Sequence, residues 1–254
     1  MQIINAPRTL IYDGTPEGFF TVIFEVYNQK INVATIAKKQ DYSPTLFDQC
    51  LAIDTNIQYG ERVLKGVAGK ISPQTIKDVL TCFLAEKEAH EMPIFHFLQK
   101  VFNNEVADHD YRDEHILAIH QIAQKVRKEA HRMKGFIRFK LSKDNAYIAT
   151  IEPDHHVLPL LAKHFKARYN DQDWIIFDVR RQKGLFYIDG SLKLLLATEP
   201  VHALHEDHFH ANEQLFQQMW KEYVKHVNIK ERKNERLQKQ HMPSRYWKYL
   251  VETE

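Results

Sequence analysis

The chain has little glycine, almost no cysteine and no long apolar run. Only 8 of its 254 residues are glycine, about 3% where ~7% is usual. No two glycines have the spacing of a dinucleotide-binding loop or a P-loop. No segment reaches the ~18 apolar residues of a membrane-spanning helix, and the first residues lack the pattern of a secretory signal. We therefore expect a cytoplasmic protein with no membrane association and no nucleotide-driven chemistry.

Metal and cofactor motifs are also missing. Cys50 and Cys82 have no near cysteine neighbour, which excludes zinc ribbons and the three-cysteine motif of a radical SAM cluster. Four histidines between residues 202 and 210 have spacings of three, three and two, which do not place them on one helix face. We interpret that segment as a loop, and we expect neither a cofactor nor a metal.

The chain does contain enough apolar residues for a core, and its charge is unevenly distributed. Hydrophobic residues make up 44% and aromatic residues 11%. Residues 1–126 hold 12 Lys and Arg against 16 Asp and Glu, a net charge of −4, whereas residues 127–254 hold 23 against 17, a net charge of +6. Basic residues alternate with Tyr and Trp over 221–248. This composition suits a phosphate backbone with stacked bases, and it suits an ordinary solvated helix equally well.

Periodicity predicts mixed secondary structure, beginning with a strand at 9–12 and a helix that starts at Pro16. A strand is expected at 46–53, and helices at 56–68, from Ser72 onward, at 91–103 and at 111–133, where Gly135 supplies the stop. From Gly135 onward, apolar residues tend to fall at every second position, which is typical of strands. Strands are expected at 135–141, 146–152, 173–179, 184–188 and 191–197, with helices at 156–169 and 210–226.

We therefore expect an α+β fold, with a mainly antiparallel sheet and a helical layer inserted after the N-terminal strand–helix unit. No linker, repeat or low-complexity tract divides the chain. A single domain over 1–254 is expected. Its helical part covers 56–134, its sheet-rich part 135–200, and its basic C-terminal helix and tail 210–254.

Cations gather where the long helix is expected to end. His131, Arg132, Lys134 and Arg138 fall within eight positions. They could hold phosphates, or they could complement the negative end of the helix dipole. Near the chain end, Arg245 with neighbouring aromatic residues could clamp a base, or the aromatics could dock the tail onto the core.

Glu152 and His155 form a second candidate, because a carboxylate beside an imidazole can perform acid–base catalysis. Asp154 is interpreted as a helix N-cap. In an antiparallel hairpin the start of one strand lies beside the end of the next. We therefore expect His131 and Arg132 to lie near Glu152 and His155 on one positively charged surface, which Arg245 joins if the tail docks there.

Five ordered blocks of the chain resemble a known family: YDGTPEGFFTVIFEVY (12–27), KEAHRMKGFIRF (128–139), IEPDHHVLPLLAKHF (151–165), DWIIFD (173–178) and NERLQKQHMPSRYWK (234–248). They are similar to the DUF4130 family, whose members are described as DNA metabolism or DNA repair proteins. Besides the residues above, the family pattern falls on Tyr12, Asp13, Gly14, Glu17, His164 and Asp178. Asp154 stands where the family usually has Glu, which favours the N-cap interpretation.

The resemblance implies two kinds of partner besides DNA. One is a radical SAM DNA modification or repair protein with a helix-hairpin-helix region, and the other is a uracil-DNA glycosylase-like protein. The sequence therefore predicts a DNA-binding accessory factor that acts with the radical SAM partner. A DNA repair enzyme of glycosylase or nuclease type, and a structural subunit that binds no DNA, are the alternatives.

The sequence and the resemblance together point to two sets of candidate residues. The catalytic candidates are His131, Glu152 and His155. The candidate nucleic-acid-binding residues are Arg132, Lys134, Arg138, Arg168, Lys230, Arg232, Lys233, Arg245, Tyr246 and Trp247.

Overall fold

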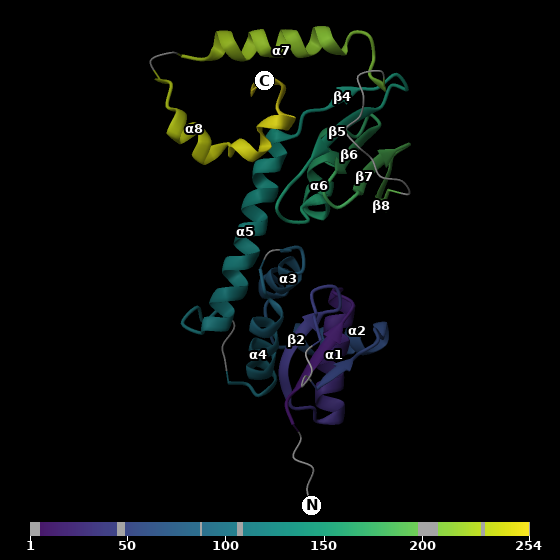
Figure 1. Ribbon diagram of the computed structural model, residues 1–254, viewed down its shortest axis with the longest axis vertical. Helices are drawn as coiled ribbons and strands as arrows, with labels where there is room; N and C mark the ends of the chain where they lie inside the picture. Colours follow the sequence, from purple (N-terminus) through teal and green to yellow (C-terminus); the bar gives the residue numbers. More distant parts are fainter. Residues whose placement is uncertain are drawn as a thin grey trace, which may run out of the picture. The chain divides into compact units, whose positions relative to one another are not determined.

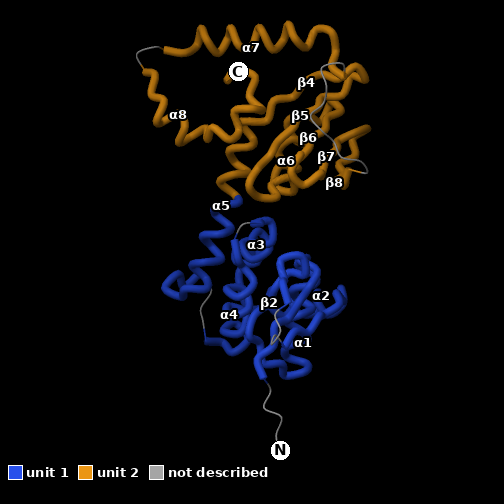
Figure 2. The backbone as a smooth tube through the Cα atoms, in the orientation of Figure 1, with its two compact units in different colours: residues 1–126 blue, residues 127–254 orange. Residues whose placement is uncertain are grey.

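The computed structural model describes residues 6–44, 49–86, 88–105, 109–197, 208–229 and 232–253. It divides the chain into two compact units, unit 1 with residues 1–126 and unit 2 with residues 127–254 (Figure 2). This boundary falls where the net charge changes from −4 to +6. The single-domain organisation expected from the sequence stays a prediction.

Unit 1 contains a three-stranded parallel sheet (Figure 1). Its strands are β1 (Arg8–Tyr12), β2 (Val33–Lys38) and β3 (Cys50–Ala52), in the order β2-β1-β3. Helix α1 (Pro16–Gln29) connects β1 to β2, and the Thr15 side chain caps it by accepting a hydrogen bond from the Gly18 amide. A helical crossover returns the chain to its starting edge, which makes the neighbouring strands parallel.

Helices complete unit 1. These are α2 (Ile57–Ala68), α3 (Pro73–Cys82) and α4 (Glu91–Phe102), and α5 (Glu114–Phe136) contains the unit boundary. Asn56 and Ser72 cap α2 and α3 through their side chains, as their position before each apolar pattern predicts.

Unit 2 contains a five-stranded mixed sheet in the order β4-β5-β6-β7-β8. The strands are β4 (Lys140–Leu141), β5 (Tyr147–Ile151), β6 (Trp174–Asp178), β7 (Lys183–Ile188) and β8 (Ser191–Leu196). Helix α6 (Leu158–Arg168) crosses between β5 and β6, which therefore pair in parallel, and the other pairs are antiparallel. The α+β class is confirmed. The mainly antiparallel sheet is wrong, because three of the six pairings between described strands are parallel.

The β4–β5 hairpin is shorter than expected because α5 continues through Gly135 to Phe136. Gly135 does not adopt the positive φ of a left-handed stop. Ile137 and Phe139 then enter the core, where the Phe139 ring meets Phe165 edge-on at a centroid distance of 5.7 Å. Only two residue pairs remain in the β4–β5 ladder.

The core of unit 2 lies between its sheet, the end of α5 and helix α6. Met133, Leu161, Trp174 and Ile176 are almost fully buried there. After β8 the chain continues into α7 (Glu213–Val227) and α8 (Glu235–His241), and the short helices η3 (Ser244–Tyr249) and η4 (Val251–Thr253) return to the end of α5 (Figure 1). Among the described helices, none combines the length and apolar character needed to cross a membrane.

Candidate functional site

The N-terminal family motif forms a strand-to-helix connection in unit 1. The Asp13 carboxylate accepts hydrogen bonds from the Thr15 amide at 2.9 Å and from the hydroxyls of Thr15 and Thr55 at 2.7 Å each. Burial would raise the pKa of Asp13, but these hydrogen bonds outweigh it and lower the pKa. Gly14 has a φ of +87°, and a Cβ at Gly18 would lie 2.2 Å from Asp13 Oδ1. The motif therefore has a structural explanation.

Tyr12 belongs to a buried polar cluster beside that connection. Its hydroxyl donates to Glu91 at 3.0 Å, and the Lys38 ammonium lies 3.6 Å from the same carboxylate. Burial, reinforced by Glu91, raises the pKa of Tyr12 far above its usual range. Glu17 is exposed. The cluster joins the C-terminal ends of two strands to the start of α4 and stabilises unit 1.

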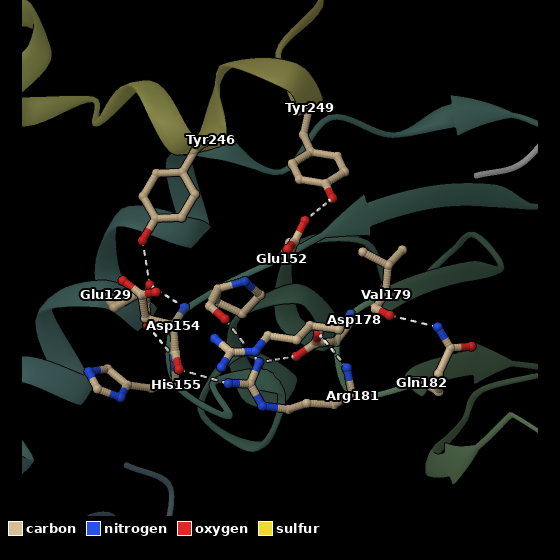
Figure 3. A network of polar contacts seen from close by, with 12 residues as sticks. Glu129, Glu152, Asp154, His155, Asp178, Val179, Arg181, Gln182, Tyr246 and Tyr249 are labelled. Carbon is tan, nitrogen blue, oxygen red and sulfur yellow. Dashed lines mark hydrogen bonds and ion pairs between the residues drawn. The ribbon is translucent and has the colours of Figure 1, made fainter. Parts of the chain in front are cut away.

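In unit 2 the C-terminal tail docks onto a buried glutamate (Figure 3). The Glu129 carboxylate, 4% exposed on α5, accepts hydrogen bonds at 2.8 Å from the backbone amides of Asp154 and His155. It also accepts a hydrogen bond from the Tyr246 hydroxyl. Burial, and then Glu129, raise the pKa of Tyr246. Tyr246 is 2% exposed, so in this arrangement its ring faces are covered by the protein and a base cannot stack on them.

Arg245 ties the tail to the same place. Its guanidinium lies 3.0 Å from Asp154 Oδ2 and 3.7 Å from Glu129 Oε1, and it stacks over the Tyr246 ring. The N-cap interpretation of Asp154 is wrong, because α6 begins four residues later behind Val157. His155 is buried, and its Nδ1 has no hydrogen-bond partner among the described residues.

A buried ion pair fixes the β6 end of this network. Arg181 Nη1 contacts Asp178 Oδ2 at 2.6 Å, and the guanidinium donates to the carbonyl oxygens of Pro153 and Asp154 at 3.0 and 2.8 Å. Burial raises the pKa of Asp178, while Arg181 opposes that shift. Asp178, a position of the family pattern, therefore has a structural role.

The Glu152 carboxylate is also bound by side chains of the C-terminal tail. It accepts hydrogen bonds from the Lys248 ammonium and, at 2.7 Å, from the Tyr249 hydroxyl. Lys248 first, and then Tyr249, lower the pKa of Glu152, and burial raises the pKa of Tyr249 to about 12. An ionised and paired carboxylate cannot act as a general acid at neutral pH.

Two cations and a histidine gather on α5 and α6 with no carboxylate partner among the described residues. We call Lys134, His164 and Arg168 the cationic cluster. Burial and the positive charges of Lys134 and Arg168 lower the pKa of His164. Arg168 stacks over the Tyr169 ring, with 5.5 Å between its Cζ and the ring centroid. Within the described part of the chain, neither Lys134 nor Arg168 forms an ion pair.

The other predicted contacts are dispersed. Arg138 is paired with Glu252, and Lys233 with Glu235. Arg232 is exposed, Trp247 donates its indole N–H to Met242 O at 2.9 Å, and Lys230 lies outside the described residues.

The predicted common surface is only partly present. His155 and Arg245 meet at Glu129, and Glu152 lies beside the same tail. His131 is exposed on α5, and Arg132 is half-buried there. Neither forms a hydrogen bond or ion pair within the described chain, with Glu152 or with any other residue.

The described residues contain no group of three or more His, Cys, Asp and Glu that could hold a metal ion. Residues 202 and 205 of the histidine segment lie outside the described chain. The expectation of a metal-free and cofactor-free protein stays a prediction.

A family model described as a domain of unknown function, DUF4130, matches residues 88–252. The chain belongs to the DUF4130 family. The matched region takes in nearly all of unit 2, including the docked tail and the cationic cluster, whereas the Tyr12 motif lies outside it. No curated protein and no solved structure shows significant similarity to the chain.

Proposed function

We propose that this DUF4130 member is a DNA-binding accessory protein, and that the cationic cluster of unit 2 binds the phosphodiester backbone. The observation that carries the proposal is the gathering of Lys134, His164 and Arg168 with no carboxylate partner in the part of the chain that the structure describes. Like charges repel one another, so a bound polyanion would stabilise this arrangement. The +6 charge of residues 127–254 adds a longer-range attraction for DNA.

An accessory role is favoured over a catalytic one because the carboxylates near the docked tail are already engaged. Glu129, Glu152 and Asp178 each accept hydrogen bonds from the protein itself. The resemblance implies a radical SAM protein with a helix-hairpin-helix region as partner, and a uracil-DNA glycosylase-like protein as another. In this proposal the partner performs the chemistry on DNA that unit 2 holds. Turnover of lesion-bearing DNA by the purified chain alone would contradict the accessory role.

The salt dependence of DNA affinity tests the binding. For several phosphate contacts we expect affinity to fall roughly 10²–10⁴-fold between about 50 and 200 mM salt. The double variant K134E/R168E should weaken binding to all sequences and lower the slope of log affinity against log salt by about 2. Fluorescence anisotropy with labelled duplex and single-stranded DNA measures both quantities.

The matched control reverses two exposed lysines of unit 1, K39E/K77E, and changes the net charge by the same amount. It should leave the slope within about 0.5 of the wild-type value. Equal slopes for the two double variants would show that the cationic cluster is not the DNA site.

The titration of His164 gives an independent test. Lys134 and Arg168 lower its pKa in the free protein. A nearby phosphate favours the imidazolium, so the His164 pKa should rise when DNA binds. The K134Q variant should raise it without DNA, because one repelling charge is removed. NMR titration of the His Cε1 signals follows both changes, with the exposed His241 as internal reference. An unchanged His164 pKa in saturating DNA would place the phosphates elsewhere.

A further inference from the structure

A groove of about 400 Å³ lies between α7 and the β4–β5 hairpin of unit 2. Four aromatic side chains contribute to its walls, together with the aliphatic Leu141 and Val251. The aromatic residues are Phe139, Tyr147, Phe216 and Trp220. None of the residues that line the groove belongs to the Glu129 network or to the cationic cluster.

Two anchors hold α7 across the hairpin. At its start, the buried Glu213 accepts a hydrogen bond from the Leu141 amide at 2.9 Å. Two turns later, Trp220 Nε1 donates to Glu252 Oε2 at 3.0 Å. Phe216 lies between these anchors, lines the groove and is still 53% exposed. The groove is thus a fixed feature of unit 2 with an accessible ring in its wall.

The chemistry of the walls suits a flat aromatic ligand. The Arg138 guanidinium stacks over the Trp220 ring, with 5.5 Å between its Cζ and the ring centroid. Its positive charge is offset by Glu252, whose Oε1 lies 2.5 Å from Arg138 Nη2. Gln217 adds a side-chain amide, whose nitrogen donates to Glu213 Oε1 at 3.0 Å and whose carbonyl oxygen can accept a hydrogen bond from a ligand. A nucleobase fits this combination, because it offers a ring face for stacking and a polar edge for an amide.

Two cations lie near the groove, Lys140 in a neighbouring hollow and Arg168 behind two aromatic rings, and neither has a carboxylate partner among the described residues. A second hollow of about 250 Å³ shares Glu213 and Gln217 with the groove and is lined by Lys140. Lys140 forms no ion pair with any described residue. On another side, the Phe139 ring meets the Tyr169 ring edge-on at 5.6 Å, and Arg168 lies over Tyr169. If one base of a nucleotide chain were bound in the groove, the phosphates on either side of that base could therefore reach Lys140 and Arg168.

We propose that this groove binds an unpaired base of single-stranded DNA, with neighbouring phosphates on Lys140 and Arg168. Bases inside a duplex are stacked on both faces, so a protein ring can stack only on a base that has left the helix. The inference rests on the proposed function, and it adds the strand state that unit 2 prefers and the place where a base is held.

The experiment uses two exposed apolar residues of the same helix. Phe216 lines the groove, whereas Met219, 59% exposed, does not. We expect F216A to weaken binding of a labelled oligothymidylate of about 20 nucleotides roughly tenfold, and to leave duplex binding unchanged. M219A should change neither affinity. Equal oligothymidylate affinities for F216A and the wild-type chain would overturn the proposal.

A second measurement reports stacking directly. An oligonucleotide with a single 2-aminopurine should lose fluorescence when its base stacks in the groove of the full chain. F216A should restore most of that fluorescence at saturating protein, and M219A should not. If the probe binds without quenching, the base is not in the groove and the proposal is wrong.

The outcomes separate this inference from the proposed function. If neither single-stranded nor duplex DNA binds, the proposed function fails, and the inference fails with it. If both bind with the K134E/R168E effect but F216A has none, only the groove assignment fails. If F216A and M219A alike weaken self-association in sedimentation and neither affects DNA, the apolar side of α7 is an interface between copies and the groove assignment is wrong.

Discussion

Replacing Glu129 with Ala is expected to lower the free energy of unfolding by about 3–5 kcal/mol. The carboxylate satisfies two backbone amides and the Tyr246 hydroxyl, and it lies near Arg245. A buried donor left without an acceptor costs about 1–3 kcal/mol. Because Tyr246 holds the tail, the change should also release residues 243–253. Chemical denaturation measures the free energy, and limited proteolysis reports the release of the tail.

Two variants control for general effects at this position. E129Q keeps the shape but offers one acceptor oxygen and a competing NH₂ group, so we expect about half of the E129A loss. K128A alters the exposed preceding residue of the same helix and should cost less than about 0.5 kcal/mol. If E129A were as mild as K128A, the Glu129 contacts would not be what holds the tail.

Local sequence signals predicted the helices of this chain well. Helix starts at Pro16 and Pro73 follow Thr15 and Ser72, and both caps are present. Strand pairing was harder, because it depends on contacts between distant segments. The strand at 33–38 was not predicted, since only Ile36 of its residues is buried and its apolar alternation is weak.

The end of α5 shows why a glycine is an uncertain stop signal. Gly135 suggested that the helix ends there, yet the helix continues to Phe136, which packs against the core of unit 2. Tertiary contacts outweigh the local preference of one glycine, whose cost in a helix is only about 1 kcal/mol. The hairpin that was to bring Arg132 beside Glu152 is shortened as a result.

The sequence pointed to several residues of the candidate site but missed Glu129, the residue at its centre. Arg245, His155 and Asp178 were all nominated, and the structure places them in one network. Glu129 was missed because a glutamate among Lys and Arg residues resembles a surface residue. A signal existed, since Glu129 lies three residues after the buried Val126 and four before the buried Met133. A carboxylate on the apolar side of a helix becomes buried, and burial of a charge is costly unless hydrogen-bond donors or a counter-charge contact it.

Replacing Arg181 with Met is expected to cost about 3–5 kcal/mol at neutral pH. The variant leaves the buried Asp178 carboxylate without its counter-charge and frees the carbonyl oxygens of Pro153 and Asp154. R180M is the matched control, because Arg180 is exposed and contributes only its backbone amide to Asp178. It should cost less than about 0.5 kcal/mol. The double variant D178N/R181M should be more stable than R181M, because it buries no unpaired charge.

The stability deficit of R181M should also depend on pH. Burial already raises the pKa of Asp178, and loss of the guanidinium removes an opposing effect, so the pKa rises further in the variant. A group whose folded-state pKa is raised contributes stability below its unfolded pKa and loses that contribution as pH rises through the folded value. The difference between R181M and the wild-type chain should therefore be largest near pH 7 and shrink toward about pH 4. Denaturation at several pH values measures it, and a constant deficit would mean that lost packing, rather than the unpaired Asp178 charge, destabilises the variant.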